Sequence, residues 1–201
     1  MRQFAVALAF SVATMTAQEP ARSGGPLRPL ALPALGDGQS CPIATGTKAV
    51  PPSPRIFGGP FWWGTGPAYV GLLWTSGDQG RFSLAPIPIE NGMRRAKTAF
   101  VADPSYSGVI EVRGGSLRRD RRPLIFGQGG APDGELMRLT APHVLDAGWV
   151  DGTGVRQPNL PALTGREWSF WPASTWIPGP GCYGIQLDTP QRSSLVVFEA
   201  L

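Results

Sequence analysis

The fold is decided by the stretch Trp176-Ile-Pro-Gly-Pro-Gly-Cys-Tyr-Gly-Ile-Gln-Leu-Asp188, which is followed after a polar turn by Ser194-Leu-Val-Val-Phe198. Its Pro- and Gly-rich part predicts a sharp corner, because proline fixes φ and glycine permits positive φ. Two short strands then follow, which is the pattern at the end of an antiparallel β-sandwich. We expect the corner to carry the chain from one sheet to the other.

The predicted strand that starts at Cys182 has two different faces, because successive side chains of a strand point to opposite sides. Tyr183, Ile185 and Leu187 share one face, and we expect them in the core. Cys182 and Gln186 lie on the other face. Cys182 should therefore bridge to a segment outside the sheet, and truncation of Gln186 should cost little stability.

From Arg55 onward, short apolar runs alternate with turn clusters at the spacing of a sandwich or barrel. The expected strands cover residues 68–74, 81–84, 108–113, 123–126, 136–139, 167–170, 182–187 and 195–198. The chain of 201 residues contains 27 glycines and 22 prolines. This composition disfavours long helices, because an interior Pro costs about 3 kcal/mol and an interior Gly about 1 kcal/mol. The chain is therefore predicted to be all-β.

The first residues are typical of an export signal. Met1-Arg2 is a short positive start, and Phe4-Ala-Val-Ala-Leu-Ala-Phe-Ser-Val-Ala13 is an apolar run too short to span a bilayer as a helix. We expect residues 1–17 to be a signal peptide cleaved after Ala17, and the alternative is an N-terminal core helix. No cysteine near this point could carry a lipid, and no later stretch has membrane-spanning length. The mature chain is expected in the periplasm or outside the cell.

Residues 18–54 carry eight prolines, with Gly and Ser between them and few aromatic or β-branched residues. This composition predicts an extended, partly polyproline spacer. Residues 55–201 are then the β-sandwich domain. If Cys41 is tied to the domain, only the first half of the spacer remains free.

Cys41 and Cys182 are the only cysteines, and an exported chain meets an oxidising environment. We therefore predict one disulfide, which in the chain-entropy model would stabilise the domain by about 4–5 kcal/mol. The alternative is a pair of unbridged, buried thiols. Two distant cysteines and a single histidine do not complete a zinc site without carboxylates, so we expect neither a metal nor another cofactor.

The C-terminal stretch resembles the end of a family of exported bacterial proteins, often lipoproteins, in which an immunoglobulin-like domain follows a Pro-rich leader. The likeness extends to Trp168-Ser-Phe-Trp171, Leu195-Val-Val-Phe198, Cys41-Pro42 and Tyr69-Val-Gly-Leu-Leu-Trp74. Two features differ, because Tyr183 replaces the usual Trp and no lipidated cysteine is evident. The resemblance implies an immunoglobulin-like antiparallel β-sandwich and an envelope location. It brings no known activity.

Five arginines crowd one short segment: Arg113, Arg118, Arg119, Arg121 and Arg122. Such a cluster could bind phosphate, acidic glycan or anionic lipid. The alternative is a solvated hairpin whose charges protect a sheet edge. No aromatic residue is interleaved to stack bases, and the net charge of the whole chain is only +4, so a nucleic-acid partner is not expected.

The aromatic residues offer a second candidate ligand surface. Trp62 and Trp63 are adjacent, so in a strand they point to opposite faces and only one can enter the core. Trp168 and Phe170 share a face, and Trp171 takes the other. Outward Trp rings could stack on sugar rings, whereas the alternative is ordinary packing in a sandwich core.

Catalytic constellations are weakly supported. His143 is the single histidine, and no Gly-x-Ser-x-Gly motif accompanies it. Asp146, Asp151 and Glu167 are the candidates for the paired carboxylates of a glycoside hydrolase. Asp151-Gly-Thr-Gly154 lacks the lysine of a phosphate-binding loop and is expected to be a turn.

These observations favour an exported, non-catalytic binding or structural module of the bacterial cell envelope, with an envelope glycan or protein as partner. One alternative is a carbohydrate-binding module that uses exposed Trp residues. Another is a hydrolase that uses an Asp/Glu pair. No feature of the sequence identifies the ligand.

Overall fold

The computed structural model describes residues 26–43, 62–72, 80–128, 130–142 and 168–201. All regular elements of these residues are β-strands. The strands are β1 (Trp62–Trp63), β2 (Ala68–Leu72), β3 (Arg81–Phe82), β4 (Ile89–Glu90), β5 (Met93–Ala102), β6 (Gly108–Ser116), β7 (Ile125–Gln128), β8 (Leu136–Ala141), β9 (Ser169–Ile177), β10 (Gly181–Asp188) and β11 (Ser193–Ala200). Within the same residues, no helix meets the length and hydropathy needed to cross a membrane.

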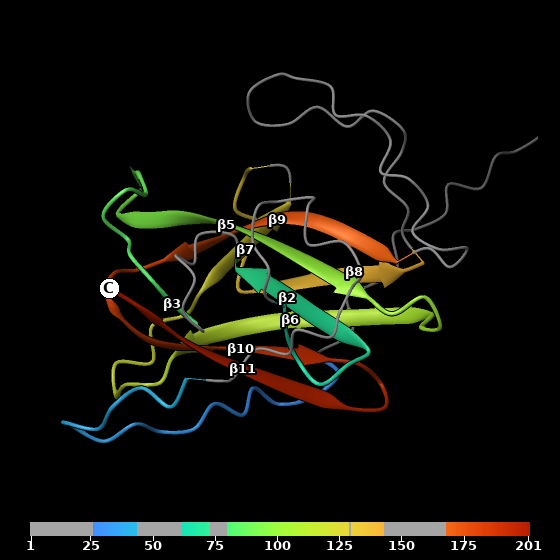
Figure 1. Ribbon diagram of the computed structural model, residues 1–201, viewed down its shortest axis with the longest axis horizontal. Helices are drawn as coiled ribbons and strands as arrows, with labels where there is room; N and C mark the ends of the chain where they lie inside the picture. The colour runs from blue at the N-terminus through green and yellow to red at the C-terminus, as the bar shows by residue number, and fades with distance from the viewer. Residues whose placement is uncertain (1–25, 44–61, 73–79, 129, 143–167) are drawn as a thin grey trace, which may run out of the picture.

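The strands form two sheets that pack face to face as a β-sandwich (Figure 1), which confirms the predicted all-β fold. Sheet A has the order β1-β2-β5-β9-β7, with β4 added to β5. Sheet B has the order β3-β11-β10-β6-β8. All pairings are antiparallel except that of β3 with β11.

The immunoglobulin-like assignment is finer than the sandwich and stays a prediction. In immunoglobulin domains the central strands B and E pair in one sheet, and C, F and G lie together in the other. Here β5 pairs with β9, while β6, β10 and β11 are neighbours. The chain nevertheless runs from β6 to β7 of sheet A before it returns to β8 of sheet B. This crossing from sheet B to sheet A and back is an addition to the immunoglobulin strand order described above.

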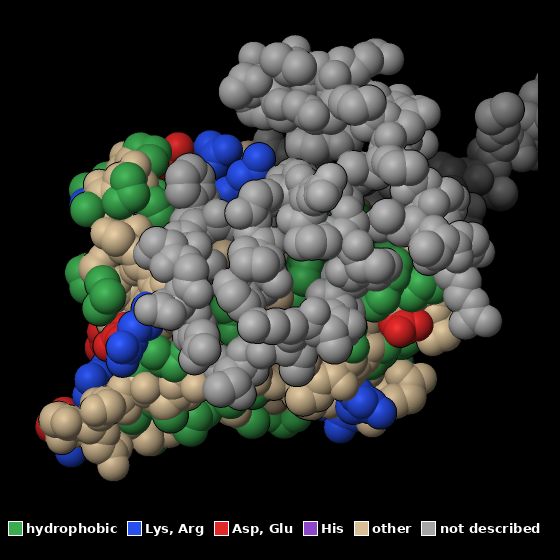
Figure 2. All heavy atoms as spheres, viewed as in Figure 1, with side chains coloured by type: hydrophobic (Ala, Val, Ile, Leu, Met, Phe, Trp, Pro, Cys, Tyr) green, Lys and Arg blue, Asp and Glu red, His purple; other side chains and the backbone are tan. Residues whose placement is uncertain are grey.

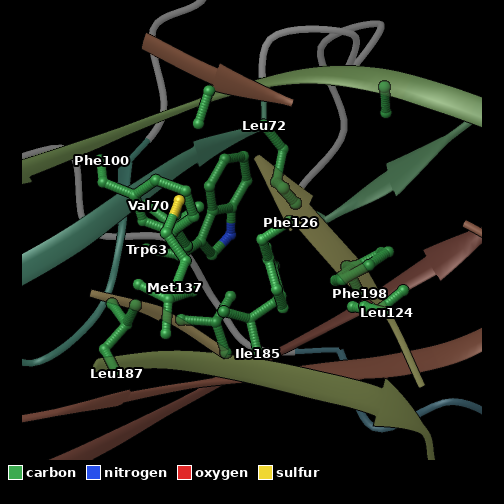
Figure 3. Packing of buried hydrophobic residues seen from close by; sticks show 14 of the residues in the cluster. Trp63, Val70, Leu72, Phe100, Leu124, Phe126, Met137, Ile185, Leu187 and Phe198 are labelled. Atoms are coloured by element: carbon green, nitrogen blue, oxygen red, sulfur yellow. The ribbon is translucent and has the colours of Figure 1, made fainter. Parts of the chain in front are cut away.

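The corner after Ile177 connects the two sheets as expected, because β9 belongs to sheet A and β10 to sheet B. The predicted register of β10 is also confirmed. Tyr183, Ile185 and Leu187 all belong to the cluster of buried side chains between the sheets. Figure 3 shows the indole of Trp63 in the middle of this cluster, with side chains of both sheets around it.

The sequence pattern does not predict β5, although it is the longest strand of those described. Its residues, Met-Arg-Arg-Ala-Lys-Thr-Ala-Phe-Val-Ala, include three alanines and a lysine, which are residue types depleted from strands. Tertiary context overrides this propensity, because β5 pairs with β2 on one side and with β9 on the other. Ala96, Phe100 and Ala102 face the core.

Residues 26–43, here called the strap, lie along the outer side of sheet B, where the blue trace passes β10 and β11 in Figure 1. Cys41 of the strap is bonded to Cys182 of β10, so the predicted disulfide is present. The expectation of a spacer whose first half is free needs correction. The strap already packs on the sandwich from Leu27 onward, because its backbone groups find partners on the sheet.

Candidate functional site

The outer face of sheet B receives the first part of the strap through polar side chains. Gln186 of β10 contacts the strap backbone twice, since its Oε1 accepts from Ala31 N at 2.8 Å and its Nε2 donates to Pro29 O at 3.0 Å. Arg113 of β6 donates to the carbonyl oxygen of Arg28. These side chains therefore bind main-chain groups of the strap, much as a neighbouring strand would.

A notch without side chains lies in the middle of this face. Gly115 of β6 and Gly184 of β10 are directly opposite each other across the two strands. A Cβ atom on Gly184 would lie 2.9 Å from Leu32 Cδ2, and one on Gly115 would lie 3.6 Å from Leu32 Cδ1. Glycine at position 184 therefore leaves the space that the Leu32 side chain of the strap occupies, whereas a Cβ at position 115 would only touch that side chain.

The last part of the strap is held by apolar packing and by the disulfide. Leu35 and Cys41 form a buried cluster with Leu117, Cys182 and Val197. The backbone N–H of Leu35 donates to Leu117 O at 2.8 Å. This cluster explains why the cysteine at the start of β10 faces away from the core.

Two members of the arginine cluster bind the strap rather than a common ligand. Arg118 donates from Nη1 to Gly36 O at 2.9 Å and from Nη2 to Gln39 O at 3.1 Å. Arg121 Nη1 donates to the carbonyl oxygens of Leu32 and Pro33 at 3.2 and 3.4 Å. The guanidinium groups thus act as donors to strap carbonyls, which are the main-chain groups that a Pro-rich segment retains at every residue.

The other arginines of the cluster have different surroundings. Arg119 is exposed and lies 3.8 Å from Asp37, whereas Arg122 Nε donates to Asp120 at 2.6 Å. Hydrogen bonds from Ser116 and Arg122 hold the pKa of Asp120 below its usual value. Arg113 is buried and pairs with Asp188 at 2.6 Å. The five arginines are therefore not gathered around one anion-binding point.

The role of Arg121 can be tested because its backbone and side chain make opposite predictions. Its φ of 46° lies in the left-handed region that glycine adopts more easily. Arg121→Gly should relieve this conformation but remove the bonds to the strap. We expect the Leu35 amide to exchange with solvent about fivefold faster, corresponding to about 1 kcal/mol of lost local stability. Arg119→Gly is the matched control and should leave Leu35 unchanged. Slower exchange at Leu35 in Arg121→Gly would show that backbone strain outweighs the side-chain bonds.

Two carboxylates lie opposite each other under the strap, a pair that the sequence did not single out. Glu111 and Asp188 are partners across β6 and β10, and both are buried. Glu111 accepts from Arg138 Nε at 2.9 Å and from Leu27 N at 2.6 Å. Asp188 accepts from Arg113 and from Gln186. Each carboxylate is therefore paired with a guanidinium, Glu111 with Arg138 and Asp188 with Arg113.

Apolar and charged residues alternate along β6, and this alternation is the only sequence signal for the network of Glu111, Arg113 and Asp188. Ile110 and Val112 face the core, and Glu111 and Arg113 take the opposite face. That pattern usually indicates a solvated face. The burial of its charged residues depends on a strap more than 65 residues away in sequence, which a local pattern does not reveal.

A groove runs beside the strap on the same side of sheet B. It has a volume of about 590 Å³, within the range of ligand sites. The lining residues are Pro26, Leu30, Leu32, Arg113, Gly114, Gly115, Ser116, Arg121, Pro123, Glu135 and Leu136. In Figure 2 the lower edge of the molecule, where Figure 1 places the strap and sheet B, shows mostly uncharged atoms with Lys and Arg side chains near its two ends. The lining of the groove is mixed, because it contains aliphatic side chains, two arginines and Glu135.

The tryptophans do not form the predicted exposed surface within the described residues. Trp63 is in the core and Trp62 faces the other side of sheet A, as expected, but Trp62 is also buried. It packs with Val101 and Phe170 on an apolar outer face. Trp171 lies in the core. These burials correct the assignment of Trp62, Trp63 and Trp171 as ligand contacts.

His143, Asp146, Asp151 and Glu167 lie outside the described residues. In the described part of the chain no group of three or more His, Cys, Asp or Glu side chains is arranged to hold a metal ion.

The chain matches no protein-family model, no curated protein and no solved structure in the three comparisons. The resemblance to exported envelope proteins accordingly stays a prediction.

Proposed function

We propose that this chain is an exported, non-catalytic binding or structural module of the bacterial cell envelope. The observation that carries the proposal is the strap, which a disulfide ties to the start of β10, the middle strand of sheet B. Such a bond persists in oxidising compartments and is rare in the cytosol. The apolar start of the sequence, read as a signal peptide, agrees with that compartment.

The non-catalytic part of the proposal is supported by the buried carboxylates. Glu111 and Asp188 are buried, and their oxygens accept hydrogen bonds from neighbouring donors. The groove beside the strap offers a surface for contact with an envelope component. A module that binds through this groove fits the described residues better than a hydrolase does.

Export can be tested by expressing the full chain in a Gram-negative host, beside a variant that lacks residues 2–17. The full chain should appear in the periplasmic fraction with an N-terminus at Gln18 by mass spectrometry. Alkylation with a maleimide polymer should find no free thiol in it. The shortened variant should stay in the cytoplasm with both thiols reactive. Retention of the full chain in the cytoplasm with reactive thiols would contradict the proposal.

The absence of catalysis needs a separate measurement. The oxidised chain should co-sediment with isolated envelope material from the host and release no soluble sugar or peptide fragments from it. Release of fragments that stops on heat inactivation would instead support the hydrolase alternative.

A further inference from the structure

The segments that carry the two cysteines are joined by one short piece of chain, Leu117-Arg118, which comes directly after β6. The backbone N–H of Leu117 donates to Cys182 O at 2.9 Å, and the carbonyl oxygen of Leu117 accepts from Leu35 N at 2.8 Å. The side chain of Leu117 is fully buried in the cluster that also contains both cysteines. Leu117 therefore links the start of β10 to the strap through its main chain and its side chain.

Arg118 holds the turn that precedes Cys41. Its guanidinium donates to the carbonyl oxygens of Gly36 and Gln39 at 2.9 and 3.1 Å, so both ends of the turn are bonded to one side chain. The turn is also closed internally, because Gln39 N donates to Gly36 O at 3.3 Å and Gly36 N donates to Gln39 Oε1 at 2.7 Å. Cys41 lies two residues after Gln39. The bonds from Arg118 therefore determine where Cys41 approaches β10.

The strap is held near Cys41 by contacts that do not involve the sulfur atoms. They are the hydrogen bond between Leu35 and Leu117, the two bonds from Arg118, and the packing of Leu35 in the apolar cluster. Every donor and acceptor in this set is the same whether the cysteines are two thiols or one disulfide. In the chain-entropy model a disulfide acts mainly on the unfolded chain. We therefore expect the strap to stay docked when the bridge is reduced.

The core face of β10 points away from the bridge. Tyr183, Ile185 and Leu187 belong to the main core cluster between the sheets. Cys182 belongs to the separate cluster that contains strap residues. Reduction of the bridge should therefore loosen the strap while the sandwich stays folded.

We propose that the strap is a redox-controlled switch, in which Leu117 and Arg118 are positioning residues that place Cys41 beside Cys182 before the bridge forms. Bridge formation converts two thiols to one disulfide, and the two electrons and two protons pass to a disulfide oxidant, which becomes two thiols. Reduction by a dithiol is the reverse exchange. The inference goes beyond the proposed binding function and does not depend on it, because a chain that binds no envelope material could still form this bridge.

The test compares the oxidised and reduced forms of the whole chain, labelled with nitrogen-15, by nuclear magnetic resonance. The amide signals of Ile110 and Ile185 in the core should keep their positions on reduction. The Leu35 amide of the reduced chain should exchange with solvent at least about tenfold more slowly than in an unstructured peptide, which corresponds to a strap that is docked about nine-tenths of the time. Addition of oxidised glutathione without denaturant should restore the spectrum of the oxidised chain.

Variants of the turn test the positioning role. Arg118→Gln should lower the protection of Leu35 in the reduced chain about fivefold, because Gln lacks the fork that donates to both carbonyls. Gln39→Ala changes only an exposed strap residue and should lower this protection about threefold, so it keeps the test valid if Arg118→Gln disturbs the sandwich. Arg119→Gln is the matched control. Arg119 is exposed and lies 3.8 Å from Asp37, so its loss should have no effect.

The rate of bridge formation is the measurement that a merely structural role would not change. Both cysteines are buried beneath the docked strap, so a glutathione adduct cannot be accommodated there and closure requires the turn to dock again. Decay of the mixed disulfide, followed by mass spectrometry, should be about fivefold slower in Arg118→Gln than in the parent chain and unchanged in Arg119→Gln.

Three results would overturn the inference. Exchange of Leu35 in the reduced chain at the rate of an unstructured peptide would show that the bridge itself docks the strap. Loss of the folded spectrum on reduction would show that the bridge maintains the sandwich and is no switch of the strap. Equal closure rates in Arg118→Gln and the parent chain would remove Arg118 as a positioning residue. Failure of export or of envelope binding, by contrast, would reject only the proposed function.

Discussion

Replacing Cys41 and Cys182 together by alanine is expected to lower the free energy of unfolding by about 5 kcal/mol, the largest effect among the changes considered. The bridge joins residues separated by 141 positions, and the chain-entropy model assigns its largest stabilisation to long loops. The strap would also lose its fixed end beside Leu35 and Leu117. Alanine is preferred to serine because both cysteines are buried, and burying a hydroxyl group costs free energy.

The measurement is a urea titration of the oxidised parent chain and of the double-alanine variant. The parent chain after reduction is the matched control, and its midpoint should fall toward that of the variant. If all three proteins unfold at the same urea concentration, the bridge contributes nothing to stability. In that case the non-covalent contacts between the strap and sheet B would be sufficient to keep the strap in place.

Truncation of Tyr183 to alanine should cost about 3–5 kcal/mol, as expected when a large buried aromatic side chain is removed. Its ring is fully buried and stacks on Phe198 with centroids 5.7 Å apart. Its hydroxyl donates to Gly179 O at 2.8 Å, at the corner that joins the two sheets. The change would therefore remove contacts of both the core and the corner.

Two further variants, measured by the same urea titration, separate the contribution of the Tyr183 ring from that of its hydroxyl and from that of the opposite face of β10. Tyr183→Phe keeps the ring and should lose only about 1 kcal/mol for the hydrogen bond. Gln186→Ala, on the opposite face, should lose about 2 kcal/mol because Gln186 makes two bonds to the strap. A Gln186→Ala cost equal to that of Tyr183→Ala would mean that strap binding matters as much as the core.

The stability of the domain at alkaline pH should also depend on Tyr183. Burial raises the pKa of Tyr183 above its ordinary value of 10.0. The folded state therefore retains the phenolic proton longer than the unfolded state does. Stability from this group is complete below pH 10 and declines as the pH rises through the folded-state pKa. Tyr183→Phe should reduce that decline.

The alternation in β10 predicted its register correctly, because the core face of a strand repeats every second residue. Cys182 and its partner were also predictable from the two-cysteine count and the face that Cys182 occupies. Strand β5 was not predictable from the sequence, because its alanines and cations adopt the strand conformation through pairing with β2 and β9. Propensity within a segment carries no information about such partners.

Less of the candidate site was predictable. Gln186 looked like a solvent-facing residue whose truncation would be harmless, and the strap that covers it makes that expectation wrong. Arg118 and Arg121 appeared as part of a charge cluster, but their carbonyl partners lie on the strap, more than 75 residues earlier. Contacts between segments so far apart depend on the complete fold. The arginine cluster suggested an anionic ligand, whereas Arg118 and Arg121 donate hydrogen bonds to carbonyl oxygens of the strap.

The bridge between the strap and β10 also determines how the domain would respond to mechanical tension. For a pull between Pro26 and Leu201, the covalent path passes from Cys41 directly to Cys182 and bypasses the chain between them. The force then enters β10 at Cys182 and leaves β11 at its C-terminal end. These points lie at the same end of one hairpin, because Cys182 pairs with Glu199 and Gly181 with Ala200. Tension would thus separate β10 from β11 successively from that end, while sheet A stays outside the loaded path.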